Sequence, residues 1–225
     1  MKLRLLALAA AAATTFAATG ALADQVTISA VAGVNITDPL ITDFNSSDGN
    51  LIIAPGYTFA QDAGGLSFIR DGVGGLLSGV SAPPPADNGV AGSFYETVEG
   101  GGSATLTAAA SISNFQFYMG SPDSFNSMTV AFVNPNLSPL VLNGTAIWGG
   151  TPPGNGDQSE GFTVSYHFDA PVKSITFASN TNSFEFDKLA GGVPEPASWA
   201  LMILGFGGAG AMVRNRRRQT VAAAA

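Results

Sequence analysis

The sequence predicts an all-β protein, an antiparallel β-sandwich of the jelly-roll kind, flanked by two short segments that direct the chain to a membrane. Many short stretches alternate apolar and polar residues, as strands with one buried face do. Glycine, proline, asparagine and aspartate separate these stretches and indicate turns. No stretch between residues 24 and 192 has convincing helical periodicity. Short alternating strands at regular spacing are typical of a sandwich.

The clearest strand covers residues 161–168, where aromatic and aliphatic side chains occupy every second position. We expect one face of it in the core (Phe162, Val164, Tyr166 and Phe168) and a polar face opposite (Thr163, Ser165 and His167). The other expected strands are residues 25–31, 51–60, 103–107, 112–119, 127–133, 140–148, 172–178 and 183–189. Residues 62–88 and 149–160 are expected to be long loops, which are usually functional or disordered.

The first 23 residues have the three parts of a secretory signal peptide in the right order. A basic start with Lys2 and Arg4 precedes an uncharged apolar run at residues 5–13. Small residues follow and end in an A-x-A site at Ala21 and Ala23. We therefore expect export by the general secretory route, with signal peptidase cutting after Ala23.

The C-terminus has the pattern of a membrane-spanning helix. Residues 197–213 are uncharged and apolar, although rich in glycine, and a bilayer core needs about 17–25 such residues. Trp199 lies where an interfacial aromatic is expected, and a basic cluster follows at once (Arg214, Arg216, Arg217 and Arg218). The orientation places the bulk of the chain outside the inner membrane and the tail, residues 219–225, inside.

A three-residue motif, Pro194-Glu195-Pro196, directly precedes this apolar run, and Trp199-Ala200 follows it three residues later. Motif, apolar segment and arginine cluster in this order, over residues 193–218, resemble the PEP-CTERM sorting domain in its PEPxxWA variant. The resemblance implies that an exosortase, a membrane protease or transpeptidase of Gram-negative bacteria, handles the chain. It implies an inner-membrane precursor that later reaches the cell surface or the medium, in bacteria that usually make extracellular polysaccharide. It implies no fold or ligand for the rest of the chain.

The part between the two signals is acidic and lacks cysteine. Residues 24–192 hold three basic residues (Arg70, Lys173 and Lys188) against fifteen acidic ones, a net charge of −12. Such a surface repels phosphate backbones, which argues against a nucleic-acid partner. Without cysteine the chain has no disulfide, no thiol catalysis and no cysteine-bound metal. Its stability is therefore expected to come from the core, with no cofactor required.

Calcium is the one metal that the sequence suggests. Asp123 with Asn126, and Asn155 with Asp157, supply oxygen ligands in turns. Neither an EF-hand nor a nonapeptide calcium repeat is present, and Asp and Asn also form turns for local hydrogen-bonding reasons. Both interpretations stay open, with turn formation favoured.

A sugar-stacking platform is suggested by Trp148, which ends an expected strand at a glycine-rich loop. The alternative, which we favour, is that Trp148 closes the core. For catalysis the candidates are the lone histidine, His167, and carboxylate pairs such as Glu185 with Asp187, since glycoside hydrolysis needs two carboxyl groups. No nucleophile motif accompanies them, so no residue is assigned as catalytic and His167 is expected to be exposed.

Two functions remain in view. The first is a non-enzymatic surface or matrix protein associated with exopolysaccharide or biofilm. The second is a carbohydrate-binding module or carbohydrate-active enzyme on the same scaffold. Fold alone does not choose between them. The absence of a convergent set of titratable residues favours the first.

Overall fold

The computed structural model describes residues 25–45, 51–75, 77, 80–120, 123–150, 158–192 and 204–206. The chain divides into two compact units, Met1–Gly192 and Val193–Ala225. The expected signal peptide, the Pro194-Glu195-Pro196 motif and the arginine cluster lie outside the described residues. Residues 204–206 are helical. In the described part of the chain, no helix has both the length and the apolar character needed to span a membrane.

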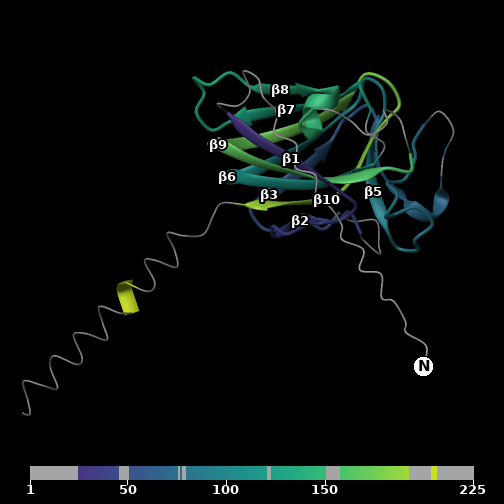
Figure 1. The fold of residues 1–225 in the computed structure, drawn as a ribbon, viewed down its shortest axis with the longest axis horizontal. Helices are drawn as coiled ribbons and strands as arrows, with labels where there is room; N and C mark the ends of the chain where they lie inside the picture. The colour runs from purple at the N-terminus through teal and green to yellow at the C-terminus, as the bar shows by residue number, and fades with distance from the viewer. Residues whose placement is uncertain are drawn as a thin grey trace, which may run out of the picture. The chain divides into compact units, whose positions relative to one another are not determined.

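The described part of the first unit is built of antiparallel strands with two short 3-10 helices, η1 (Gly72–Gly74) and η2 (Gly144–Trp148) (Figure 1). The strands are β1 (Val26–Ala32), β2 (Leu40–Thr42), β3 (Tyr57–Gln61), β4 (Ser67–Asp71), β5 (Phe94–Val98), β6 (Ser103–Gly120), β7 (Asn126–Phe132), β8 (Leu140–Asn143), β9 (Gly161–Ser179) and β10 (Phe184–Gly192). The all-β antiparallel prediction is confirmed. We call this unit the β domain.

The strands form one ten-stranded sheet rather than two separate ones. Its main path runs β4-β5-β10-β6-β9-β7-β8, while β1 pairs with β9, β2 with β10 and β3 with β6. The long strands β6 and β9 lie side by side through its middle (Figure 1). Their pairing shifts register between Thr107 and Ile112 and again before Asn114. Bulges bend strands and increase their twist, so both strands turn here and the sheet curls onto itself.

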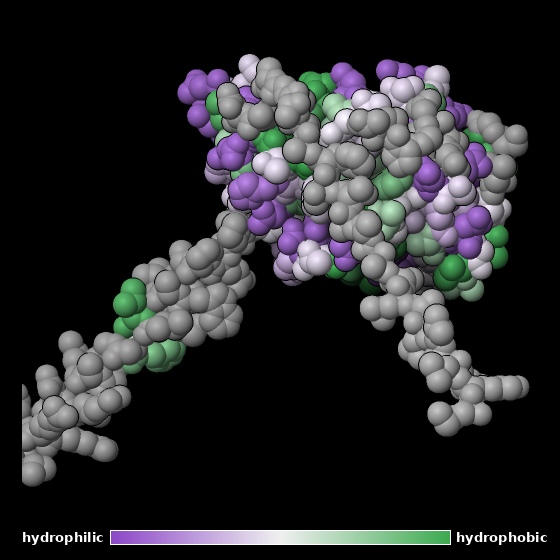
Figure 2. All heavy atoms as spheres, viewed as in Figure 1, coloured by the Kyte–Doolittle hydropathy of each residue, from purple (hydrophilic) through white to green (hydrophobic). Residues whose placement is uncertain are grey.

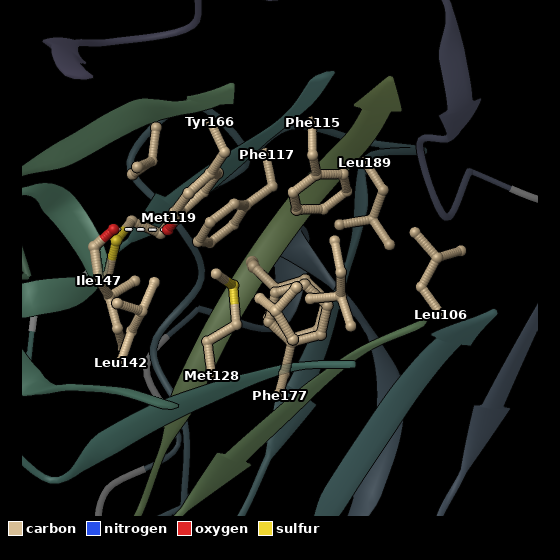
Figure 3. Packing of buried hydrophobic residues seen from close by; sticks show 14 of the residues in the cluster. Leu106, Phe115, Phe117, Met119, Met128, Leu142, Ile147, Tyr166, Phe177 and Leu189 are labelled. Carbon is tan, nitrogen blue, oxygen red and sulfur yellow. Dashed lines mark hydrogen bonds between the residues drawn. The ribbon is translucent and has the colours of Figure 1, made fainter. Parts of the chain in front are cut away.

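The curled sheet encloses an aromatic core to which its two halves contribute. Phe115 and Phe117 come from the second half of β6, which pairs with the first half of β9. Phe177 comes from the second half of β9, which pairs with β7. Figure 3 shows these rings facing one another across the interior, and Phe117 and Phe177 meet edge to face with centroids 5.4 Å apart. The two halves thus pack in the manner of a sandwich.

Several expected elements differ in extent. Residues 103–107 with 112–119, and 161–168 with 172–178, form two long bulged strands instead of four short ones. The expected strand at 51–60 begins only at Tyr57 because Pro55 and Gly56 precede it in a turn. The expected loop at 62–88 contains β4 and η1, and β2 and β5 lie in stretches for which we expected no strand. Asp71 starts η1, since its carboxylate accepts a hydrogen bond from the Val73 N–H at 2.9 Å.

The predicted inner face of β9 is in the core, with Val164 fully buried and Tyr166 at 3% exposure. The opposite face is not uniformly exposed, because residues 33–38 cross over it. The Thr163 hydroxyl donates to the Gly33 carbonyl at 2.8 Å and accepts from the Asn35 N–H at 2.7 Å. Thr163 therefore lies on the expected polar face but is buried under residues 33–38, while His167 on the same face is exposed as expected. Figure 2 shows hydrophilic residues spread over the visible surface of the β domain.

Candidate functional site

The suggested calcium ligands Asp123 and Asn126 lie in a turn at the start of β7. The Asn126 N–H donates to the Asp123 carbonyl, and the Asn126 side-chain oxygen accepts from the Ser179 hydroxyl at 2.9 Å. The amide oxygen therefore ties β7 to the end of β9, and Asn126 is 1% exposed. In the described ranges no group of three or more His, Asp or Glu side chains is placed to hold a metal ion. Asp157 lies outside these ranges.

Trp148 is not an exposed platform. It ends η2, is 3% exposed and belongs to the hydrophobic core cluster. Gly149 next to it adopts a left-handed conformation that turns the chain over Ile28. The preceding residue, Ile147, accepts a hydrogen bond from the buried Tyr166 hydroxyl (Figure 3). The ring is part of the core, in line with the favoured interpretation that Trp148 closes it and not with the sugar-stacking alternative.

His167 lies on the outside of β9, where Nδ1 is 2.7 Å from the Asn114 side-chain oxygen of β6. These two residues are paired across the ladder, so the contact is the ordinary one between neighbouring strands. A catalytic histidine needs a nucleophile and an orienting carboxylate beside it. Among the described residues, the hydrogen-bond partner of the ring is the Asn114 amide and not a carboxylate or a nucleophile.

The carboxylates of Glu185 and Asp187 point away from Phe184 and Phe186, as the alternation predicts. That face is not open to solvent, because residues 80–93, the covering segment, pack over it. Glu185 is 2% exposed and its Oε1 accepts hydrogen bonds from the Ala82 N–H at 2.8 Å and from the Ser183 hydroxyl. Burial raises the pKa of Glu185 to about 7. Glu185 thus holds the covering segment, and as a glycosidase acid it has no access to a glycan.

Sequence reasoning missed a second contact of the covering segment, the Lys188 cluster, made of Lys188, Asp87 and Asp187. Lys188 Nζ lies 3.2 Å from Asp87 Oδ1 and also contacts Asp187 Oδ2. Asp87 is 1% exposed and Asp187 fully buried. Burial, and then the charge of Asp87, raises the pKa of Asp187 to about 8. Burial lowers the pKa of Lys188, but the two carboxylates outweigh it and raise that pKa overall. The sequence signal was Lys188 itself, one of only three basic residues in the domain. Its partner Asp87 could not be identified from the sequence, because it lies 101 positions away.

Glu96 of β5 is another buried carboxyl, and it points toward the opposite half of the sheet. The Gln61 amide of β3 donates to its Oε2 at 2.7 Å. Its Oε1 is buried with no hydrogen-bond partner among the described residues. Burial raises the pKa of Glu96 to about 8, so this side chain is neutral at pH 7. It is a structural group between two strands rather than an accessible acid.

Three solved structures resemble the β domain distantly. A family 29 carbohydrate-binding module is 11% identical, with a TM-score of 0.37, and the match covers 72% of this chain and 99% of that one. The enzymatically active domain of tailspike protein 4 from bacteriophage CBA120 is 12% identical, with a TM-score of 0.33, over 68% of this chain and 22% of that one. A family 11 module of a cellulosomal cellulase from Clostridium thermocellum is 10% identical, with a TM-score of 0.20, over 72% and 99%. No ligand or activity is inferred from likenesses this weak.

A search of the curated proteins found no match. A family model does match the C-terminus: the PEP-CTERM protein-sorting motif covers residues 192–218. The match begins at the last residue of β10, where the β domain ends. It confirms the resemblance seen in Pro194, Glu195, Pro196 and the segment that follows. This chain is therefore a protein that carries a PEP-CTERM sorting domain at its C-terminus.

Proposed function

We propose that this chain is an exported protein that an exosortase sorts from the inner membrane to the cell surface or the medium. The observation that carries the proposal is the sorting motif over residues 192–218. Its position supports the proposal, because β10 ends at Gly192, the residue at which the motif match begins. The signal-peptide pattern of the first 23 residues supplies the route of export, with signal peptidase as the first partner.

The motif is suited to recognition at a membrane surface. Each proline fixes its own φ near −65° and biases the residue before it toward an extended conformation. A protease cleft binds such a stiff segment at low entropic cost. Glu195 adds one charge for recognition, and Trp199 with the arginine cluster sets the depth of the apolar segment in the bilayer.

The β domain itself is proposed to be non-enzymatic and to associate with extracellular polysaccharide. Burial of Glu185, Asp187 and Glu96 supports the first part, since none of these carboxyls is open to solvent. Burial of Trp148 weighs against a dedicated sugar-binding module, and the large exposed hydrophobics of the described β domain are all aliphatic. A glycan array with residues 24–192, with and without calcium, tests the polysaccharide partner. Tight binding of one defined oligosaccharide would favour the binding-module alternative.

The sorting proposal is tested in a host that has its own exosortase. With Glu195→Ala, or with the four arginines replaced by glutamine, the chain is expected to stay in the membrane fraction with its C-terminus uncut. Asp169→Ala is the matched control, because it removes an exposed acid of the β domain and leaves the motif intact. Membrane fractionation and intact mass give the readout. Release of the Glu195→Ala protein at its processed size would show that the motif is not the signal.

A further inference from the structure

The Lys188 cluster brings an amine and a carboxyl together from two distant parts of the chain. Lys188 is in the last strand, Asp87 is in the covering segment, and 101 positions separate them. In a regular strand, neighbouring residues point to opposite faces. Here β10 carries a bulge in its pairing with β6 between Asp187 and Ala190, and Lys188 has φ 53°. This left-handed conformation is uncommon for a residue with a side chain, and the bulge lets Asp187 and Lys188 converge on Asp87.

The covering segment holds Asp87 in place from several sides. Its N–H donates to the Pro84 carbonyl at 2.8 Å, and the Gly89 N–H donates to the Gly72 carbonyl at 2.9 Å. A Cβ at Gly72 would lie 2.0 Å from the Asp87 carbonyl oxygen, so only glycine permits this packing. The backbone that carries Asp87 is therefore fixed, and its carboxyl meets Lys188 at a defined position.

The two oxygens of Asp87 are in different surroundings. Oδ1 accepts a hydrogen bond from the Ser93 hydroxyl at 2.6 Å and contacts Lys188 Nζ. Oδ2 is buried and has no hydrogen-bond partner among the described residues. A buried carboxylate oxygen without a partner is costly. The ring of the buried Tyr118 lies beside the amine, with Nζ 6.0 Å from its centroid, and helps to keep water away.

We propose that Lys188 and Asp87 become joined by an amide bond between their side chains, with Asp187 as the group that moves the proton. Nζ attacks Cγ of Asp87, a C–N bond forms, and the bond from Cγ to Oδ2 breaks. Oδ1 stays as the amide oxygen and keeps its hydrogen bond from Ser93. The ammonium gives up two protons, and both leave with Oδ2 as one water molecule. No oxidant, reductant or cofactor takes part.

The contacts of Asp187 fit the proton-carrying role. Its Oδ2 contacts Nζ, and its Oδ1 accepts the Lys188 backbone N–H at 2.6 Å, which fixes the orientation of the carboxyl. Two buried carboxyls sharing one ammonium favour a state in which one of them holds a proton. Asp187 passes such a proton to the departing Oδ2 and takes one from Nζ. The three groups meet only in the folded chain, so the bond forms after folding.

The chain has no cysteine, so the amide bond would supply a covalent cross-link where no disulfide can form. A covalent link that closes a long loop lowers the conformational entropy of the unfolded chain more than one that closes a short loop, as for a disulfide. It would close the covering segment permanently over Glu185 and Asp187. Because Asp87 is 1% exposed and Asp187 is fully buried, the link is also protected from hydrolysis.

Intact mass of the full chain tests the proposal, with both termini of the same sample mapped by peptide sequencing. The folded wild-type protein is expected to weigh one water less than its sequence. Tandem mass spectrometry of a digest is expected to show the peptides containing Asp87 and Lys188 as one linked species. Full sequence mass in the folded wild-type protein, or a missing water without linked peptides, as in a succinimide, overturns the proposal.

Variants separate the roles of the three residues. Lys188→Arg keeps the cation and the ion pairs but lacks the amine, and it is expected to have its full sequence mass. Asp87→Asn is expected to lose ammonia in place of water if it links. Asp187→Asn keeps the size of the side chain and is expected to prevent the loss of water, and a linked product in this variant overturns the assignment of Asp187. Circular dichroism confirms that each variant is folded before its mass is interpreted.

Discussion

Phe186 of β10 stacks on Phe177 of β9 with ring centroids 4.3 Å apart and an interplanar angle of 27°. Both rings are fully buried. Phe186 belongs to the half of the curled sheet that carries the covering segment, and Phe177 belongs to the half that pairs with β7. This contact therefore joins the two halves at the centre of the core.

Truncation of either ring should be strongly destabilising. Phe177→Ala is expected to lower the free energy of unfolding by about 3–5 kcal/mol, because it removes buried surface and leaves a cavity. The double variant with Phe186→Ala should show a coupling of about 0.5–1.5 kcal/mol, the range for paired aromatic rings. Val141→Ala on the exposed face of β8 is the control. Urea denaturation gives all four values, and strictly additive losses would contradict the stacked contact.

Trp148 distinguishes a core role from a binding role. Because the ring is buried, Trp148→Ala is expected to lower the free energy of unfolding by about 3–5 kcal/mol. Trp148→Phe should cost much less, since phenylalanine retains most of the ring and removes an indole N–H with no partner among the described residues. Thermal melts of both variants give the comparison. An unchanged melting temperature for Trp148→Ala would mean that the ring is not packed in the core.

Much of the architecture was predictable, and the failures have physical causes. The alternation in residues 161–168 identified the buried face correctly, because every second side chain of a strand meets the core. The same alternation does not indicate whether another segment packs on the opposite face. It therefore did not predict that other parts of the chain bury Thr163 and Glu185. A bulge also interrupts the alternation, and for this reason the long strands β6 and β9 were each predicted as two short strands.

The candidate site was less predictable than the fold. Asp87, Asp187 and Lys188 meet through a contact between segments 101 positions apart. No local sequence pattern predicts such a contact. Trp148 illustrates the opposite difficulty. A tryptophan beside a glycine-rich loop has the same local sequence whether its ring closes a core or lies on a surface. The sorting motif was predictable because its parts are contiguous in the chain.

The buried Glu96 predicts a pH dependence of stability. Its pKa is about 8 in the folded protein against an ordinary 4.5, so the folded state binds the proton more tightly than the unfolded state. The stabilising contribution is complete below about pH 4.5 and is lost as the pH rises toward 8. Glu185, with a pKa of about 7, acts in the same direction.

Glu96→Gln isolates this contribution, because glutamine resembles the neutral acid and does not titrate. The variant is expected to lose less stability than the wild-type protein between pH 5 and pH 8. Urea midpoints measured across this range give the two slopes. Parallel slopes would mean that Glu96 is not buried as a neutral acid. Val141→Ala, which changes an exposed residue of β8 and no titratable group, is the control and should leave the slope unchanged.

The end of β10 predicts a sharp boundary between the β domain and the sorting signal. Ala190 pairs with Leu40 of β2 and with Gln116 of β6, and Gly192 pairs with Asn114. The Gly191 N–H donates to the Pro39 carbonyl at 2.9 Å. The last residues of β10 are thus held on both sides, and Leu189 is fully buried in the core. All of these contacts are made within the β domain.

A chain ending after Gly192 is therefore expected to melt cooperatively, at the same temperature as the full chain. A chain ending after Asp187 loses Leu189, the pairing with β2 and the Lys188 cluster, so it should unfold or lose most of its stability. The two truncated chains differ by five residues at one end, which makes each the control of the other. Circular dichroism melts decide the outcome. If the shorter chain melted like the longer one, the C-terminal half of β10 would not be part of the cooperative core.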